Sequence, residues 1–157
     1  MGIYHRGSNA AILNSEIEYA IKWYLKRLIG PHMFARLHIL ARHMEFPLQR
    51  TKAELIGYFT DEKSPRKFDM NLSTKLKRTG ILRGIAHECV HIKQYVKNQL
   101  WDIDEPVGAQ HCRWKMRIIR AKDYKYRELP WEKEAFRMER NLYTAYKRHL
   151  EKEGITF

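Results

Sequence analysis

The chain has 157 residues, of which 44% are hydrophobic, 12% aromatic and 31% charged. This balance excludes disordered, collagen-like and low-complexity proteins, and the length suits one domain, spanning residues 1–157, with a core of its own. Thirty Lys and Arg against 18 Asp and Glu give a formal net charge of +12. An acidic partner, such as nucleic acid or an acidic protein, would therefore be attracted electrostatically.

The sequence contains no apolar run of the roughly 18 residues that a membrane-spanning helix needs, and its first residues lack the apolar region of a secretory signal. Cys89 and Cys112 are its only cysteines, too few for the disulfide framework of an exported protein. We therefore expect a cytoplasmic protein with reduced thiols and no contact with a membrane.

The first element predicted is a helix that begins at Ser15. Ser15 and Glu18 match a capping box, in which the two side chains satisfy backbone groups at the helix start. Apolar residues then recur at helical spacing as far as Leu28, and Gly30 followed by proline ends the pattern.

Three strands are expected next. Alternation of apolar and polar residues over 36–42 predicts a half-buried strand, with a helix as the alternative. Residues 54–60 and 66–72 are two further candidates, joined by a loop at 61–65 whose composition suits a hairpin.

A long helix is predicted over residues 76–100, followed by an irregular stretch over 101–110. Residues 111–120 are typical of strands, with Lys122-Asp123 as a possible hairpin turn, and a last helix runs from Pro130 to Glu153. The fold class expected from this order is α+β: an N-terminal helix, a small, mainly antiparallel sheet of about three strands, and two further helices.

The chemistry is indicated by His87-Glu88-x-x-His91, which lies inside the long helix. Histidines four residues apart lie on one face of a helix, so both imidazoles can bind one divalent metal ion. Glu88 lies about 100° further around the helix, a poor position for a ligand but a suitable one for a general base acting on a metal-bound water.

The two histidines lie nearly opposite the apolar stripe of this helix and beside Gly80 and Gly84. They therefore do not simply fill the core, although two histidines hydrogen-bonded on a second packing face remain the alternative. Cys89 is on the stripe and is expected to be a buried apolar residue rather than a ligand. The stripe consists of Leu82, Ile85, Cys89, Ile92 and Val96.

Two histidines need at least one more protein ligand, and the first turn of the last helix offers Glu132 and Glu134. These carboxylates lie about 200° apart around that helix, so one of them at most can face the metal. We favour Glu132, with Glu139 on the same face as a possible hydrogen-bond acceptor for a ligand. Glu134 and Glu139 could also be ordinary helix charges in solvent.

The segments HECVHIKQY, residues 87–95, and PWEKEA, residues 130–135, resemble motifs of small viral and bacterial gluzincin-like metallopeptidases, including phage proteins. The resemblance covers roughly residues 35–145 and implies a zincin-like fold. In that group the third zinc ligand is a Glu three residues before a small residue, which corresponds to Glu132 before Ala135. Many members have an Asp four residues after that Glu, where this chain has Phe136.

The resemblance implies a zinc peptidase in which Glu88 takes a proton from the attacking water and passes it to the leaving amine. His111, Tyr95, Tyr124 and Tyr126 are open candidates for stabilising the oxyanion. A substrate strand would pair with a sheet edge supplied by residues 36–42 or 66–72. A phage-encoded enzyme would act in the host cytoplasm or the virion.

The alternative function is a basic nucleic-acid-binding or virion-associated protein in which zinc only holds two helices together. A second metal site at His111 and Cys112 is not favoured, because no further cysteine is near. His38 and His43 would face opposite sides of a strand, which argues against a joint site. Trp101, Trp114 and Trp131 are expected to pack rather than to stack on bases.

Overall fold

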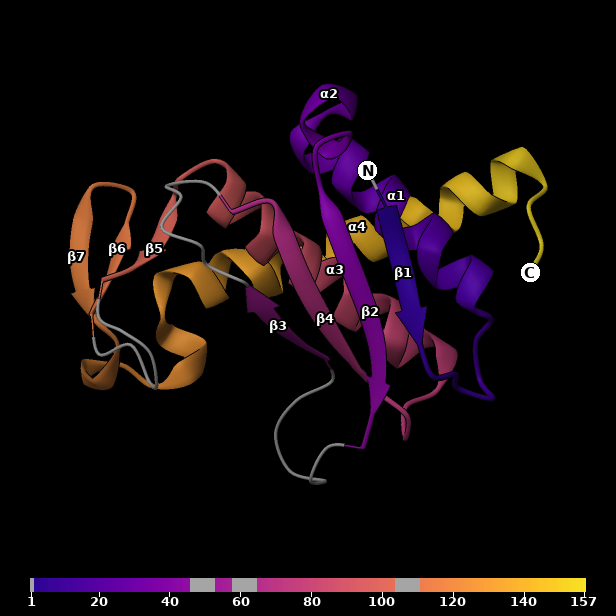
Figure 1. Ribbon diagram of the computed structural model, residues 1–157, viewed down its shortest axis with the longest axis horizontal. Helices are drawn as coiled ribbons and strands as arrows, with labels where there is room; N and C mark the ends of the chain where they lie inside the picture. Colours follow the sequence, from indigo (N-terminus) through magenta and orange to yellow (C-terminus); the bar gives the residue numbers. More distant parts are fainter. Residues whose placement is uncertain (1, 46–52, 58–64, 104–110) are drawn as a thin grey trace.

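The chain contains both helices and strands, and a computed structural model describes residues 2–45, 53–57, 65–103 and 111–157 (Figure 1). The elements are β1 Gly2–Arg6, α1 Asn14–Ile29, α2 Pro31–Phe34, β2 His38–Met44, β3 Ala53–Gly57, β4 Lys67–Ser73, α3 Arg78–Val96, β5 Leu100–Asp102, β6 His111–Trp114, β7 Arg117–Arg120, the 3-10 helices η1 Ala121–Asp123 and η2 Tyr126–Glu128, and α4 Pro130–Glu153.

The main sheet has four strands in the order β1-β2-β4-β3. Strand β2 is parallel to both β1 and β4, and only β3 is antiparallel to its neighbour β4. The expectation of helices combined with a small sheet is confirmed, but the expected mainly antiparallel pairing is wrong for this sheet, which also has one strand more than expected. The missing element was β1, whose parallel pairing with β2 depends on the crossover through α1, a tertiary arrangement that alternation within one strand does not report.

Both strands expected to offer a free edge, at residues 36–42 and 66–72, are interior. They correspond to β2 and β4, and each has a neighbour on both sides. Strand β1 pairs with β2 along one edge, and β3 pairs with β4 along the other. The outer strands of this sheet are therefore β1 and β3, and the prediction of a substrate edge at β2 or β4 is wrong.

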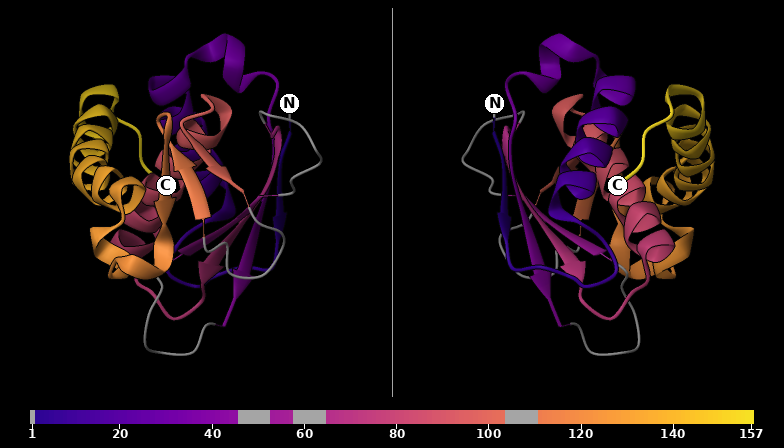
Figure 2. Two further views of the ribbon diagram at one scale, coloured as in Figure 1. Left: turned by 90° about the vertical axis from the view of Figure 1, so that its left-hand side faces the viewer. Right: turned by 90° about the vertical axis from the view of Figure 1, so that its right-hand side faces the viewer.

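Helices α1, α3 and α4 lie on one face of the main sheet, with α3 central (Figure 2). Helix α3 packs against α1, α4, β3 and β4. Its apolar stripe is buried as expected, Cys89 included, and belongs to the large core between sheet and helices. The buried stripe therefore anchors α3 in this core.

A second, antiparallel sheet, β5-β6-β7, lies beside the start of α4 (Figure 1). It covers a smaller apolar cluster that contains Trp114 and Trp131, which pack as expected. Residues 111–120 are strands, as predicted, but the turn lies at Lys115-Met116, where both residues have positive φ. Such a two-residue turn matches the twist of a hairpin. Lys122 and Asp123 lie in η1 instead.

The helix boundaries follow the sequence prediction closely at the C-terminal end of the chain. Helix α4 has the predicted bounds and ends at Gly154, whose left-handed conformation suits glycine. Helix α1 begins one residue earlier than predicted, and Leu13 occupies the N-cap position with no side-chain hydrogen bond. The capping box is therefore wrong, because Ser15 lies within the first turn and Glu18 instead pairs with Lys22.

Two further predictions are met in part. Helix α3 is shorter than the predicted helix at 76–100, because residue 100 already begins β5, and β5 replaces the start of the stretch expected to be irregular. Strand β3 matches the beginning of the candidate at 54–60; residues 58–60, most of the loop at 61–65, and residues 104–110 lie outside the described residues. Among the helices described, none is both long enough and apolar enough to cross a membrane.

Candidate metal centre

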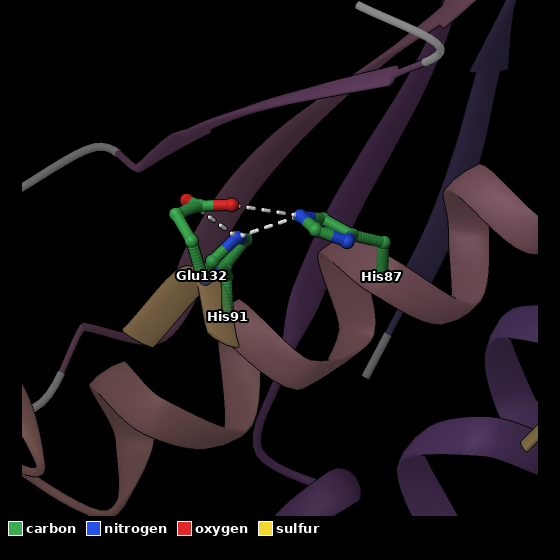
Figure 3. Close-up of side chains that lie close together, drawn as sticks. All are labelled: His87, His91 and Glu132. Atoms are coloured by element: carbon green, nitrogen blue, oxygen red, sulfur yellow. Dashed lines mark hydrogen bonds and ion pairs between the residues drawn. The ribbon is translucent and has the colours of Figure 1, made fainter. Parts of the chain in front are cut away.

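The structure brings the three predicted ligands, His87, His91 and Glu132, into one cluster (Figure 3). His87 and His91 are one turn apart on α3 and point the same way, with their Nε2 atoms 3.1 Å apart. Glu132 reaches them from the first turn of α4, which Pro130 opens at a position where its missing N–H costs no hydrogen bond. Residues 45 positions apart in the sequence, His87 and Glu132, thereby meet.

The carboxylate of Glu132 faces both imidazoles. Its Oε2 lies 3.2 Å from Nε2 of His87, and its Oε1 lies 3.2 Å from Nε2 of His91. Ligand atoms about 2.0–2.1 Å from one ion at tetrahedral angles lie about 3.3 Å apart. The observed separations have this size, so the three side chains can hold one metal ion with little movement.

Gln94 determines which nitrogen of His91 carries the proton. The amide nitrogen of Gln94 contacts two acceptors, the backbone oxygen of Trp131 at 3.1 Å and Oε2 of Glu134 at 2.9 Å. The amide oxygen therefore faces His91 Nδ1, 2.8 Å away. Because that oxygen can only accept, His91 donates from Nδ1, and in the neutral ring the lone pair is on Nε2, toward Glu132.

Glu139 has the same relation to His87. Its Oε2 lies 3.4 Å from Nδ1 of His87, and Arg83 holds its Oε1 at 2.7 Å. Glu139 therefore lies where the sequence analysis placed an acceptor for His87. Phe136, at the position where many gluzincins carry an Asp, instead packs its ring against His87, with centroids 4.6 Å apart.

Glu134 faces away from the cluster, as the helical geometry indicated, but it is not a charge in open solvent. It accepts hydrogen bonds from Gln94, Lys93 and Lys115. Burial opposes its ionisation, and these donors outweigh burial and lower the pKa of Glu134 to about 2. An ionised Glu134 thus anchors the amide that orients His91.

Buried negative charge dominates the cluster. Glu88, Glu132 and Glu139 are each 5% exposed or less. Burial alone would lower the pKa of His87, but hydrogen bonds to Glu132 and Glu139 outweigh it and raise that pKa to about 9. Burial would likewise raise the pKa of Glu132, and its bonds to the two histidines lower it to about 2. The field that favours protons here also favours a divalent cation.

Glu88 lies on α3 next to His87 and is buried. Its negative charge favours the protonated forms of both His87 and His91 and so contributes to their raised pKa values. Its role as a base stays a prediction.

The four candidates for an oxyanion donor do not form one group. His111 and Tyr124 line the same hollow against β7, whereas Tyr95 packs against both apolar clusters. Tyr126, in η2, is 55% exposed. The sequence analysis did not single out Gln94; its position three residues after His91, on the same helical face, was the available signal.

The part of the chain that the structure describes contains one group of three His, Cys, Asp or Glu residues arranged to hold a metal, and it is this cluster. Both cysteines are buried as free thiols. Comparison with protein-family models finds no match, and comparisons with curated proteins and with solved structures likewise find none. The function must therefore be argued from the cluster itself.

Proposed function

We propose that this protein is a zinc-dependent metallopeptidase with a zincin-like fold. The observation that carries the proposal is the convergence of two imidazole nitrogens and one carboxylate at separations of 3.1–3.2 Å. The Nδ1 atoms of His91 and His87, on the far side of each ring, already contact Gln94 and Glu139. An arrangement that leaves three electron-rich atoms facing one point suits a cation better than a packing role.

The ligand set favours zinc. Imidazole and carboxylate ligands in tetrahedral geometry are typical of this ion, and catalytic zinc sites commonly use three protein ligands, leaving a position for water. A structural site would normally have four protein ligands. Among the described residues the group has three members, which supports catalysis.

Zinc held by His87, His91 and Glu132 would act as a Lewis acid and bring the pKa of a water molecule toward neutrality. Glu88 then accepts a proton from the water that attacks the peptide carbonyl carbon. As the bond to the amide nitrogen breaks, Glu88 donates that proton to the leaving amine. Gln94 and Glu139 keep the two imidazoles oriented throughout.

Strand β3 is where we place the substrate. It is an outer strand of the main sheet, packs beside α3, and crosses above the three side chains in the view of Figure 3. An extended peptide that paired with this edge would run over the metal centre. The edge strand is therefore β3 rather than β2 or β4.

A second function is supported by one observation, the low exposure of the cluster. His87, His91 and Glu132 are 7%, 8% and 4% exposed. An ion so well buried could have a purely structural role, in which it ties α3 to α4. The protein would then be the basic nucleic-acid-binding or virion-associated component expected as the alternative.

The test is Glu88→Gln, with Glu128→Gln on the exposed η2 as a matched control. We expect both variants and the wild type to bind one zinc per chain, measured by elemental analysis. Hydrolysis of labelled casein should fall at least about a hundredfold in Glu88→Gln only, since general bases contribute about 10²–10⁴-fold. Zinc binding without hydrolysis in the wild type would favour the structural ion, and unchanged hydrolysis in Glu88→Gln would reject the mechanism.

A further inference from the structure

Residues 111–128, which form β6, β7, η1 and η2, make up a strongly basic surface that the metal centre does not use. We call it the hairpin surface. It contains seven Lys or Arg and two Asp or Glu, so its net positive charge per residue is higher than that of the chain as a whole. Six of its basic side chains are exposed: Lys115, Arg117, Arg120, Lys122, Lys125 and Arg127.

The same surface exposes large apolar side chains. Met116 is 90% exposed, Ile118 70%, Tyr126 55% and Tyr124 44%. Ile118 and Tyr124 also line a hollow of about 690 Å³, together with His111, Ile119, Arg120 and Asp123. Apolar area of this kind, surrounded by like charges, is typical of a surface that binds a partner.

Strand β7 gives the hairpin surface a strand edge. In the sheet order β5-β6-β7 it is the outer strand and, among the described residues, pairs with β6 alone. An outer strand has backbone N–H and C=O groups available on its free side, which an extended polypeptide can pair with. A nucleic acid cannot form such a ladder.

The hairpin surface lies close to the metal centre. Arg127 in η2 stacks over the ring of Phe136 at 4.9 Å, and the same ring contacts His87. At Arg127 the hairpin surface is therefore separated from His87 by one aromatic ring.

We infer that the hairpin surface binds an extended acidic polypeptide, which pairs with the free edge of β7. Acidic side chains of this partner meet the exposed cations of the hairpin surface, and its apolar side chains cover Ile118, Tyr124 and Tyr126. The exposed apolar residues, such as Met116, favour a polypeptide over nucleic acid, because apolar side chains can cover them and a phosphate backbone cannot. The inference goes beyond the proposed function and does not depend on hydrolysis.

The experiment uses the full chain carrying Glu88→Gln, so that cleavage cannot interfere, and a fluorescent random copolymer of glutamate and tyrosine as the probe. Binding is measured by anisotropy at several NaCl concentrations. The surface variant is Arg120→Gln, Lys122→Gln and Lys125→Gln. The control is Arg140→Gln, Arg148→Gln and Lys152→Gln, three exposed residues of α4 with the same total charge.

We expect the surface variant to bind the copolymer about tenfold more weakly, and the control about as tightly as the parent, because each exposed charge contact contributes modestly. Hydrogen exchange should show protection of β7 amides on binding. Equal weakening in both variants would reduce the effect to net charge and overturn the inference. Tighter binding of an oligothymidylate, or of vesicles containing phosphatidylserine, would overturn it in favour of nucleic acid or membrane, and protection confined to β3 would also overturn it.

Discussion

Gln94→Ala tests how the ring of His91 is oriented, without replacing any of the three predicted metal ligands. Gln94 is fully buried and connects His91 to α4 through the backbone of Trp131 and the carboxylate of Glu134. Alanine removes the acceptor for His91 Nδ1 and a donor to two buried oxygens. It leaves α3 intact, since alanine is the best helix former.

The magnitude follows from what is left unpaired. Loss of an outer hydrogen-bond partner of a metal-binding histidine costs about 10–100-fold in metal affinity, which corresponds to about 1.4–2.8 kcal/mol. The metal-free protein should also lose about 1–3 kcal/mol of unfolding free energy, because buried polar groups lose their partners. Both losses are large enough to measure separately.

Zinc affinity is measured by competition with a chromophoric chelator, and stability by urea unfolding in EDTA. Lys93→Ala is the matched control, because it removes one cation from Glu134, which keeps its bonds to Gln94 and Lys115. We expect zinc affinity within about threefold of wild type in this control. If Gln94→Ala lost stability but bound zinc as tightly as wild type, the amide would be structural and the orientation argument would be refuted.

Three other predictions follow. Glu132→Ala should lose zinc on dialysis while Glu134→Ala retains it, measured as metal per chain; equal loss would mean that the two carboxylates share the ion. Burial lowers the pKa of His5, an effect that Glu18 opposes only in part, so the folded chain prefers the neutral ring. The free energy of unfolding should be highest above about pH 6.5, the pKa of histidine in the unfolded chain, and should fall at lower pH, where the unfolded chain takes up the proton more readily than the folded one. Urea unfolding of His5→Leu at several pH values should show a weaker dependence on pH. The hydroxyl of Tyr24 is buried without a hydrogen-bond partner among the described residues, so Tyr24→Phe should leave stability within about 1 kcal/mol of wild type, or raise it; a loss above about 2 kcal/mol in the same assay would show a bond to that hydroxyl.

The metal cluster could be predicted from the sequence because the geometry of a helix depends only on nearby residues. A spacing of four residues fixes the angle between His87 and His91, and the angle of about 200° between Glu132 and Glu134 separates ligand from non-ligand. Both angles hold wherever the helices lie. The long-range contact was harder to anticipate, since nothing in either helix alone requires Glu132 to meet His87. The need of two histidines for a third ligand directed the prediction to the first turn of the last helix, and the resemblance of the PWEKEA segment agreed with it.

The parts that sequence analysis missed depend on neighbours far away in the chain. The parallel pairing of β1 with β2 is decided by the crossover through α1, and the hairpin turn lies at Lys115-Met116 although neither residue favours positive φ. Gln94 was missed for a similar reason. Its role depends on Trp131 and Glu134, which α4 brings to it.

A cation site inside a protein of net charge +12 requires that local charge outweigh the total. Glu88, Glu132 and Glu139 are buried beside the ligands, whereas the exposed cations of the hairpin surface are screened by salt over about 10 Å. The two binding events should therefore differ in salt dependence. Raising NaCl should weaken binding of the acidic copolymer strongly and change zinc affinity little. If zinc affinity fell as steeply as copolymer binding, the ion would be held at an exposed position, and the buried cluster could not be its site.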